Sequence, residues 1–240
     1  MARVQRMEGK VVAITGASSG IGRGLAERFA AEGASVVLGA RTQSKLDEVA
    51  ASIKARGGRA LAVAMDVRRE EDIVRFVKSA VDRFGRLDVF VNNAGIGVWK
   101  RVEETSLAEL HAVLRTNLYG TFLGCREAFR QMRSQGGGTI INVSSMAGKD
   151  AWEGTGVYSA SKFGIQGLSR ALADEGRAVN VRVACLCPGM VDTPMIGTED
   201  VSSRDELIQV ADVADAAIYL ATLAPNVMVQ ELLLERKLAD

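Results

Sequence analysis

The feature that most constrains the fold of this chain is a regular alternation between two apolar patterns. Seven runs rich in valine and isoleucine recur along the 240 residues, at 11–14, 35–38, 61–65, 87–91, 139–143, 181–186 and 227–234. Most runs are too continuous for a strand with one face in water, so they predict strands buried on both faces. Between them, apolar residues recur every four positions, as at Ile21, Leu25 and Phe29, which predicts helices.

Further helical segments are expected at 46–55, 73–81, 107–132, 157–172 and 213–223. A strand followed by a helix along the whole chain implies right-handed crossovers and a parallel sheet with helices on both faces. We therefore expect an α/β protein with a Rossmann-like, doubly wound and mostly parallel sheet of seven strands. No proline-rich linker or repeat interrupts the alternation, so residues 1–240 are expected to form a single domain.

Composition argues against several classes of partner. The net charge is +1 and no basic run exceeds two residues, so nucleic acid is not expected as a partner. No stretch approaches the roughly 18–20 apolar residues of a membrane span, and residues 1–10 lack the apolar region of a signal peptide. One histidine, three cysteines and no CxxC motif predict neither a metal site nor a disulfide framework. The expected location is the cytoplasm, with reduced cysteines.

A glycine-rich turn follows the first predicted strand. The sequence TGASSGIG at 15–22 places Gly16, Gly20 and Gly22 between a strand and a helix, where a doubly wound sheet binds a dinucleotide pyrophosphate. Side chains at Gly16 or Gly20 would hold the phosphates away from the backbone N–H groups of the helix start, and Gly22 would let the helix pack closely. The alternative is a tight turn that uses glycine for positive φ.

Several motifs in order resemble the short-chain dehydrogenase/reductase family in its classical form. The spacing GxxxGxG is followed by NNAG at 92–95, TNLYG around Asn117, INVSS ending at Ser145, YSASK with Tyr158 and Lys162, and PGMVDT. The resemblance covers nearly the whole chain. It implies an oxidoreductase that uses a nicotinamide cofactor.

Tyr158 and Lys162 are four residues apart on a predicted helix and therefore share a face. An ammonium group near a phenol stabilises the phenolate, which makes Tyr158 suitable as an acid/base near neutral pH. The alternative for this pair is a simple surface contact between neighbouring helical turns.

The resemblance also implies a catalytic serine and an asparagine. The family's serine lies about a dozen residues before the tyrosine, which favours Ser145 over Ser144. Its hydroxyl would bond the substrate oxygen. Asn117 would hold a water that relays protons towards Lys162, or would satisfy nearby backbone groups instead.

Other positions match family sites for the cofactor. Asp66 would contact the adenine and Thr193 the nicotinamide carboxamide or a phosphate. The complete set that the motifs imply is Gly16, Ser18, Ser19, Gly20, Ile21, Gly22, Arg41, Asp66, Val67, Asn93, Ala94, Gly95, Tyr158, Lys162, Pro188, Gly189, Val191 and Thr193.

The end of the second strand indicates NADP(H) rather than NAD(H). Folds that choose NAD place a carboxylate about 20 residues past the glycines, but Ala40 stands there and Arg41 follows. An arginine can bind the 2′-phosphate in a bidentate way. A solvated arginine at a strand end is the alternative.

Near the C-terminal side of the predicted site, Met190, Met195 and Ile196 are expected to form an apolar wall, and Trp99 and Trp152 either line the cleft or pack in the core. The polar segment 195–207 is expected to be a mobile lid over the substrate.

The helices at 107–132 and 157–172 carry apolar residues on more than one face. Together with the resemblance, they predict a homodimer or homotetramer.

The function expected from these residues is NADP(H)-dependent interconversion of a carbonyl compound and its secondary or primary alcohol, with Tyr158 as acid/base. A non-catalytic dinucleotide-binding sensor or scaffold of the same fold is the alternative. A nucleotide-sugar epimerase or dehydratase is less well matched, because its glycine spacing differs and its C-terminal half is longer. The sequence leaves the substrate open, since loops form the pocket walls of such folds.

Overall fold

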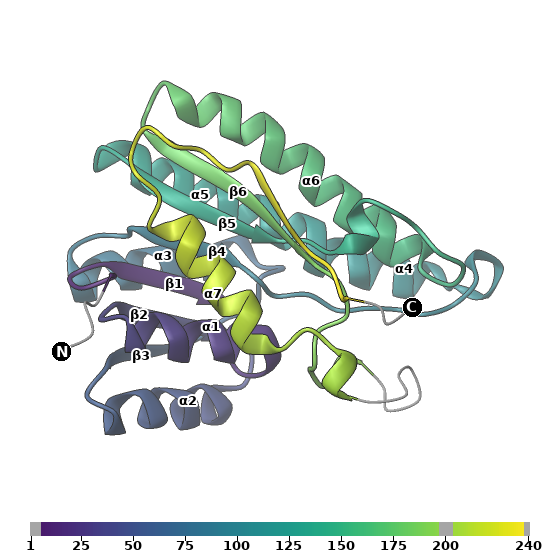
Figure 1. The fold of residues 1–240 in the computed structure, drawn as a ribbon, viewed down its shortest axis with the longest axis horizontal. Helices are drawn as coiled ribbons and strands as arrows, with labels where there is room; N and C mark the ends of the chain where they lie inside the picture. Colours follow the sequence, from purple (N-terminus) through teal and green to yellow (C-terminus); the bar gives the residue numbers. More distant parts are fainter. Residues whose placement is uncertain (1–5, 197–203, 238–240) are drawn as a thin grey trace.

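The computed structural model describes residues 6–196 and 204–237 of the chain. It contains a sheet of seven strands in the order β3-β2-β1-β4-β5-β6-β7, and every neighbouring pair is parallel. The strands are β1 (Val11–Thr15), β2 (Ser35–Ala40), β3 (Arg59–Ala64), β4 (Val89–Asn92), β5 (Gly138–Val143), β6 (Val181–Pro188) and β7 (Glu231–Leu234). The expected doubly wound, Rossmann-like fold is confirmed, with its strand order reversing between β1 and β4 (Figure 1).

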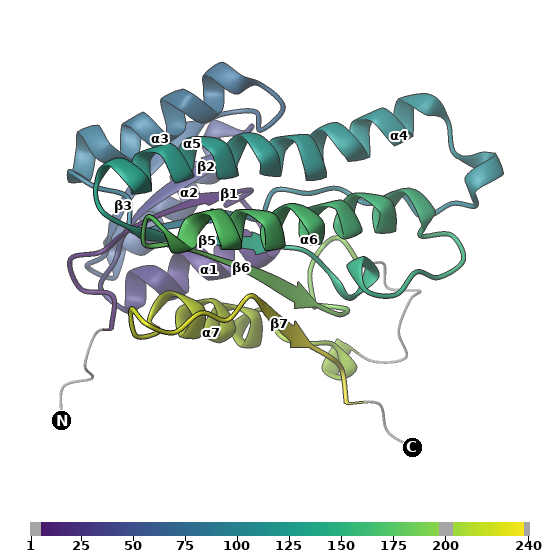
Figure 2. The ribbon, with the colours of Figure 1, turned by 90° about the horizontal axis from the view of Figure 1, so that it is seen from above.

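Helices cover both faces of this sheet. They are α1 (Gly20–Ala31), α2 (Gln43–Ala55), α3 (Glu70–Phe84), α4 (Leu107–Val113), α5 (Gly120–Ser134), α6 (Gly156–Arg177) and α7 (Val210–Ala221). In Figure 2, α5 and α6 lie on one side of the sheet and α7 lies on the other. Each face has its own hydrophobic core, one built with α1, α2 and α7 and the other with α3 and α5.

Three elements differ from the sequence expectation. The predicted helix at 107–132 is divided by a π-helical segment, η2 (Leu114–Tyr119), between α4 and α5. Strand β7 begins at Glu231 rather than at 227, because Val227 closes a turn onto the carbonyl of Ala224 (N to O 2.9 Å). Strands β3 and β7 are the sheet edges, so their residues are partly exposed and not buried on both faces.

The segment 195–207, expected as a lid, is only partly described. Residues 197–203 lie outside the described residues. Met195 is exposed, a short 3-10 helix, η4, spans Arg204–Glu206, and Leu207 is buried. The lid therefore stays a prediction.

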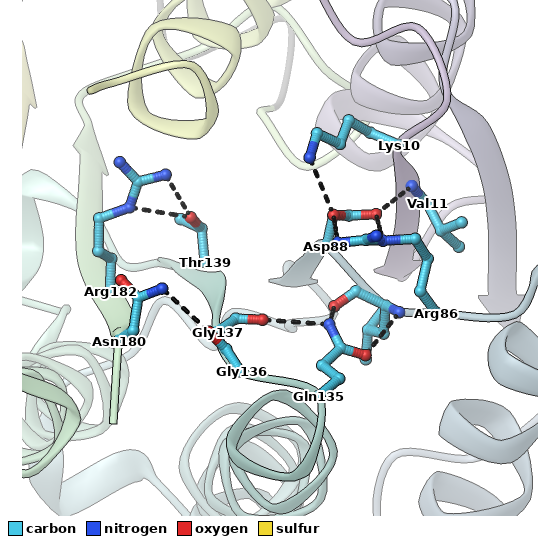
Figure 3. Close-up of polar contacts among 11 residues, drawn as sticks. Lys10, Val11, Arg86, Asp88, Gln135, Gly136, Gly137, Thr139, Asn180 and Arg182 are labelled. Carbon is cyan, nitrogen blue, oxygen red and sulfur yellow. Dashed lines mark hydrogen bonds and ion pairs between the residues drawn. The ribbon is translucent and has the colours of Figure 1, made fainter. Parts of the chain in front are cut away.

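Polar side chains connect the amino ends of the strands, at the edge opposite to the predicted site (Figure 3). The carboxylate of Asp88 accepts hydrogen bonds from the backbone N–H of Val11 (2.9 Å), from Lys10 Nζ (3.3 Å) and from Arg86 Nε (2.8 Å). Since Asp88 is 9% exposed, its charge is stabilised by these donors rather than by bulk water. This carboxylate therefore joins β1 to the start of β4.

Arg182 and Gln135 extend the same network. Arg182 donates to Thr139 Oγ1 (3.0 Å) on β5 and to the carbonyl of Leu223 (2.6 Å) after α7, and burial lowers the pKa of its guanidinium. Gln135 donates to the carbonyl of Leu87 (2.7 Å) and accepts from the N–H of the same residue (3.1 Å). The amino edge is thus a structural edge, where polar groups are used to hold strands and helices together.

We predict that Asp88→Ala lowers the free energy of unfolding by about 1.5–3 kcal/mol, because it removes hydrogen bonds between a charged acceptor and a buried N–H. Urea unfolding measures the change. The matched control is Asp82→Ala on α3, whose carboxylate pairs with Lys78 (2.6 Å) but is 59% exposed. That control should lose less than about 0.5 kcal/mol, and an equal loss in both variants would contradict the role of Asp88.

Candidate active site

One large cavity lies at the carboxyl edge of the sheet, where the strand order reverses. Its volume is about 1210 Å³, and it is lined by residues from the segments that follow all seven strands. Since all strands are parallel, every segment that leaves a carboxyl end is brought to this edge, which is where open α/β sheets bind their ligands.

The glycine turn after β1 forms one wall of this cavity. Gly16 and Gly20 both adopt positive φ, at +68° and +50°, so the turn needs glycine for its backbone alone. A Cβ on Gly16 would lie 2.9 Å from Ala94 Cα, and a Cβ on Gly22 would lie 2.2 Å from the carbonyl oxygen of Gly16. Both readings of the motif are therefore compatible with the structure: the glycines make a tight turn, and they bring backbone close to the cavity.

Helix α1 begins at this turn and directs its N-terminus to the cavity. Its N-cap residue, Ser19, is extended and makes no side-chain capping bond, and the first turn holds no acidic residue. Backbone N–H groups at a helix start and the helix dipole favour an anion. The turn can therefore hold the phosphates of a dinucleotide.

Thr15 and Asn93 connect the turn to the loop after β4. The hydroxyl of Thr15 accepts from the backbone N–H groups of Asn93 (3.0 Å) and Ala94 (3.1 Å). The amide of Asn93 donates to the carbonyls of Thr15 (2.9 Å) and Gly16 (3.3 Å). The sequence analysis missed Thr15, although a hydroxyl at the end of an apolar strand is a detectable signal.

Tyr158 and Lys162 lie on the same face of α6, as their spacing predicts. Lys162 is 5% exposed, its ammonium donates to the carbonyl of Val143 (3.0 Å), and it lies 5.5 Å from the centroid of the Tyr158 ring. Both side chains line the cavity. The arrangement places a buried positive charge next to a phenol at the cavity wall.

The two candidate serines have different surroundings. Ser144 is 3% exposed and donates its hydroxyl proton to the carbonyl of Lys162 (3.1 Å), so it fastens β5 to α6. Both serines line the cavity, but the Oγ of Ser145 accepts from the N–H of Ala147 (3.1 Å), which leaves its own proton for another acceptor.

Asn117 is buried in the π-helical segment and does not line the cavity. Its Oδ1 accepts from the N–H of Ile96 (2.9 Å), and its Nδ2 donates to the carbonyl of Ile96 (2.9 Å) and to Ser161 Oγ (3.0 Å). The side chain therefore satisfies nearby backbone groups, which was the alternative considered for it. Since both N–H donors and one lone pair of Oδ1 are used within the protein, the amide holds the loop after β4 against α6, and a relay role stays a prediction.

At the opposite end of the cavity, Asp66 is paired with Arg68. Arg68 donates to both carboxylate oxygens of Asp66 (2.9 Å from Nε and 2.5 Å from Nη2), and these bonds hold the pKa of that carboxyl below its usual range, with a smaller contribution from Arg41. Arg41 and Lys45 are exposed and also line the cavity, next to Ala40. The sequence analysis did not single out Arg68 and Lys45.

The cavity brings together all of the predicted site residues except Asn117. They are Gly16, Ser18, Ser19, Gly20, Ile21, Gly22, Arg41, Asp66, Val67, Asn93, Ala94, Gly95, Ser145, Tyr158, Lys162, Pro188, Gly189, Val191 and Thr193. Met190, Met195, Ile196, Trp99 and Trp152 line it as well. Within residues 6–196 and 204–237, no cluster of three His, Cys, Asp or Glu suited to a metal occurs, and no helix has the length and apolarity to cross a bilayer.

We predict that Gly22→Ala is strongly destabilising, because the new methyl group would overlap the carbonyl oxygen of Gly16. The matched control is Gly167→Ala on α6, where a Cβ would meet nothing within 4 Å. Alanine at that helical position should be neutral or stabilising by up to about 1 kcal/mol. Urea unfolding of both variants measures the difference, and equal stability would show that the contact at Gly22 relaxes easily.

Comparison with known proteins assigns this fold and site to a family. The family model for short chain dehydrogenase matches residues 10–204. An uncharacterized oxidoreductase of Staphylococcus saprophyticus is 34% identical over 94% of this chain and 96% of that protein. The mitochondrial borneol dehydrogenase of Lavandula x intermedia is 39% identical over 91% of this chain and 86% of that protein.

A solved structure agrees with these relatives. The crystal structure of a metagenomic short-chain oxidoreductase in complex with NADP has a TM-score of 0.85 and 35% identity, and the match covers 98% of this chain and 100% of that one. The fold, the cavity at the strand reversal and the motifs along the chain thus have one explanation: the protein belongs to the short-chain dehydrogenase family of oxidoreductases, which bind a nicotinamide dinucleotide.

Proposed function

We propose that this protein interconverts a carbonyl compound and the corresponding secondary or primary alcohol, with NADP(H) as its cofactor. The observation that carries the proposal is the position of Tyr158, at the wall of the cavity and beside the buried ammonium of Lys162. A scaffold that binds a dinucleotide without chemistry has no need for a buried cation next to a phenol.

The chemistry divides between cofactor and protein. Bound reduced nicotinamide supplies the hydride for the carbonyl carbon. Tyr158 gives its phenolic proton to the carbonyl oxygen, and the positive charge of Lys162 stabilises the phenolate that remains. Ser145 donates a hydrogen bond to the same oxygen, which orients and polarises the substrate. In the direction of oxidation, Tyr158 accepts the proton of the alcohol.

Two further residues act indirectly in this proposal. Asn117 holds the loop after β4 through Ile96, and we assign any proton relay towards Lys162 to waters near its backbone rather than to its amide. Ser144 fixes α6 through the carbonyl of Lys162. Both are positioning residues.

The choice of NADP(H) rests on the end of β2. Ala40 offers no carboxylate to repel a 2′-phosphate, and Arg41 lies at the cavity with Lys45 and Arg68 nearby. The related oxidoreductase that was solved in complex with NADP supports the same assignment. Asp66 would contact the adenine, and Thr193 the nicotinamide end.

The same proposal includes a homo-oligomer and a lid. Phe122 on α5 and Phe163 on α6 are exposed, at 43% and 47%, which supports a contact between copies through these helices as a dimer or tetramer. Met195 and Ile196 line the cavity, which supports the proposal that the segment 195–207 covers a substrate. The three cysteines are unpaired and buried, which fits a reducing compartment such as the cytoplasm.

We predict that Tyr158→Phe lowers turnover at least about 100-fold while folding and cofactor binding persist, because only the hydroxyl is removed. Oxidation of NADPH with a panel of ketones, aldehydes, diketones and quinones measures the rate. Ser145→Ala should lower turnover far more than Ser144→Ala. Near-normal turnover of Tyr158→Phe would refute the acid/base assignment, and the reverse order of the serine variants would show that Ser144 is the catalytic one.

We predict that NADPH is preferred to NADH by at least tenfold in kcat/KM, since a hydrogen bond to a charged group contributes about 1.5–3 kcal/mol. Ala40→Asp combined with Arg41→Gln should remove or reverse this preference. Arg56→Gln is the matched control, because Arg56 is 68% exposed and ends α2 away from the cavity. Equal use of both cofactors by the unmodified protein would contradict the role of Arg41.

A further inference from the structure

The chain contains two tryptophans, and both line the cavity. Trp99 lies in the loop after β4 and Trp152 in the loop between β5 and α6. Their exposed fractions are 50% and 52%, so about half of each indole contacts water. Large apolar side chains left half-exposed at a cavity mark a surface that a ligand can cover.

The two loops that carry these indoles are fastened to each other. The N–H of Lys100 donates to the carbonyl of Gly154 (2.9 Å), and Arg101 forms an ion pair with Glu153. Trp152 itself lies in a tight turn, where its backbone N–H donates to Thr155 Oγ1 (3.0 Å). The two loops that carry Trp99 and Trp152 therefore form one connected edge of the cavity.

Trp99 also contacts the proposed acid/base directly. Its ring meets the ring of Tyr158 edge to face, with centroids 4.8 Å apart and an interplanar angle of 61°. A Cβ on Gly97 would lie 2.7 Å from Trp99 Cζ2, so the indole occupies space that a side chain at residue 97 would take. A substrate whose oxygen bonds Tyr158 must therefore have the Trp99 indole as a neighbour.

Five large apolar side chains also line the cavity, and Thr155, beside Trp152, adds a neutral hydroxyl. The apolar side chains are those of Ile96, Met146, Met190, Met195 and Ile196. The segment after β7 contributes Glu235 and Arg236 to the cavity, which together add no net charge. A neutral and apolar substrate suits this wall better than a carboxylate or an ammonium compound.

We propose that Trp99 and Trp152 form an aromatic clamp and that the substrate is a neutral carbonyl compound with an aromatic ring next to the carbonyl carbon. The inference rests on the proposed function. A flat ring can pack against both indoles in offset or edge-to-face geometry while its carbonyl oxygen reaches Tyr158 and Ser145. An open chain of equal carbon number covers less of the two indoles.

Three ketones with eight carbons each test the clamp: acetophenone, 1-cyclohexylethanone and 2-octanone. Each variant is compared with the unmodified protein on the same ketone, so differences in intrinsic reactivity cancel. Trp99→Ala should lower kcat/KM for acetophenone roughly tenfold, mainly through KM, because the ring contact and its buried area are lost. The loss with 2-octanone should stay below about threefold.

Matched variants separate the clamp from a general effect. Trp99→Phe keeps an aromatic ring and should retain much of the preference for acetophenone. Trp152→Ala should act in the same direction as Trp99→Ala. Tyr219→Ala removes an aromatic ring that is 49% exposed on α7 and does not line the cavity, and it should change none of the three ketones.

Binding can be measured without turnover. Because both tryptophans line the cavity, fluorescence excited at 295 nm reports on the clamp alone. Titration with 1-phenylethanol, without and with NADP⁺, should shift the emission to shorter wavelength as water leaves the indoles. An equal concentration of 2-octanol should shift it less, and Trp99→Phe should reduce the shift.

The outcomes distinguish the clamp from the proposed function. Equal losses of Trp99→Ala on all three ketones would show that Trp99 only supports Tyr158, and the clamp would be refuted although the reductase activity stands. If no carbonyl compound is reduced with either cofactor, the proposed function fails. The emission shift with 1-phenylethanol then decides the clamp, and its absence overturns it.

Discussion

The seam between the end of β1 and the loop after β4 is the contact on which the rest of the site depends. Thr15 and Asn93 exchange four hydrogen bonds across it with backbone groups, and Gly16 leaves no room for a Cβ against Ala94. Chains that leave β1 and β4 turn to opposite faces of the sheet, so a crevice opens between them. The seam fixes the two walls of that crevice relative to each other.

A second set of buried polar contacts fixes α6 to the same walls. Asn117 connects the loop after β4 to Ser161, while Ser144 and Lys162 bond the helix to the end of β5. Each of these groups is buried and hydrogen-bonded, and such networks hold one arrangement because a broken bond leaves an unpaired polar group. Tyr158 is thus positioned by this network, of which Ser144 and Lys162 also line the cavity while Asn117 and Ser161 do not.

The sequence predicted the strands, the fold class and the gathering of nearly all site residues, because periodicity reports burial and parallel strands share one carboxyl edge. It left open whether Asn117 holds a water or satisfies backbone groups, since a π-helical segment shifts side-chain directions without changing apolar spacing. It also missed Arg68, which lies only two residues after Asp66, because an arginine near an aspartate in sequence has the same appearance on any solvated surface. The start of β7 was wrong because the apolar run at 227–234 is longer than the strand, and Val227 belongs to a turn that an apolar pattern does not reveal.

Side chains at the amino edge of the sheet serve stability, whereas those at the carboxyl edge serve ligand binding. At the amino edge, the charged groups of Asp88 and Arg182 form hydrogen bonds with backbone and side-chain partners. These bonds contribute to stability, and they occupy the two charged groups so that they do not bind a ligand. At the carboxyl edge, Trp99 and Trp152 project from loops and stay half-exposed, and neither belongs to the two cores. Substitution at such positions changes what the cavity accepts while the sheet persists. Relatives that share a third of their sequence with this chain can therefore keep one fold, and the loops after β4 and β5 are where their substrates would diverge.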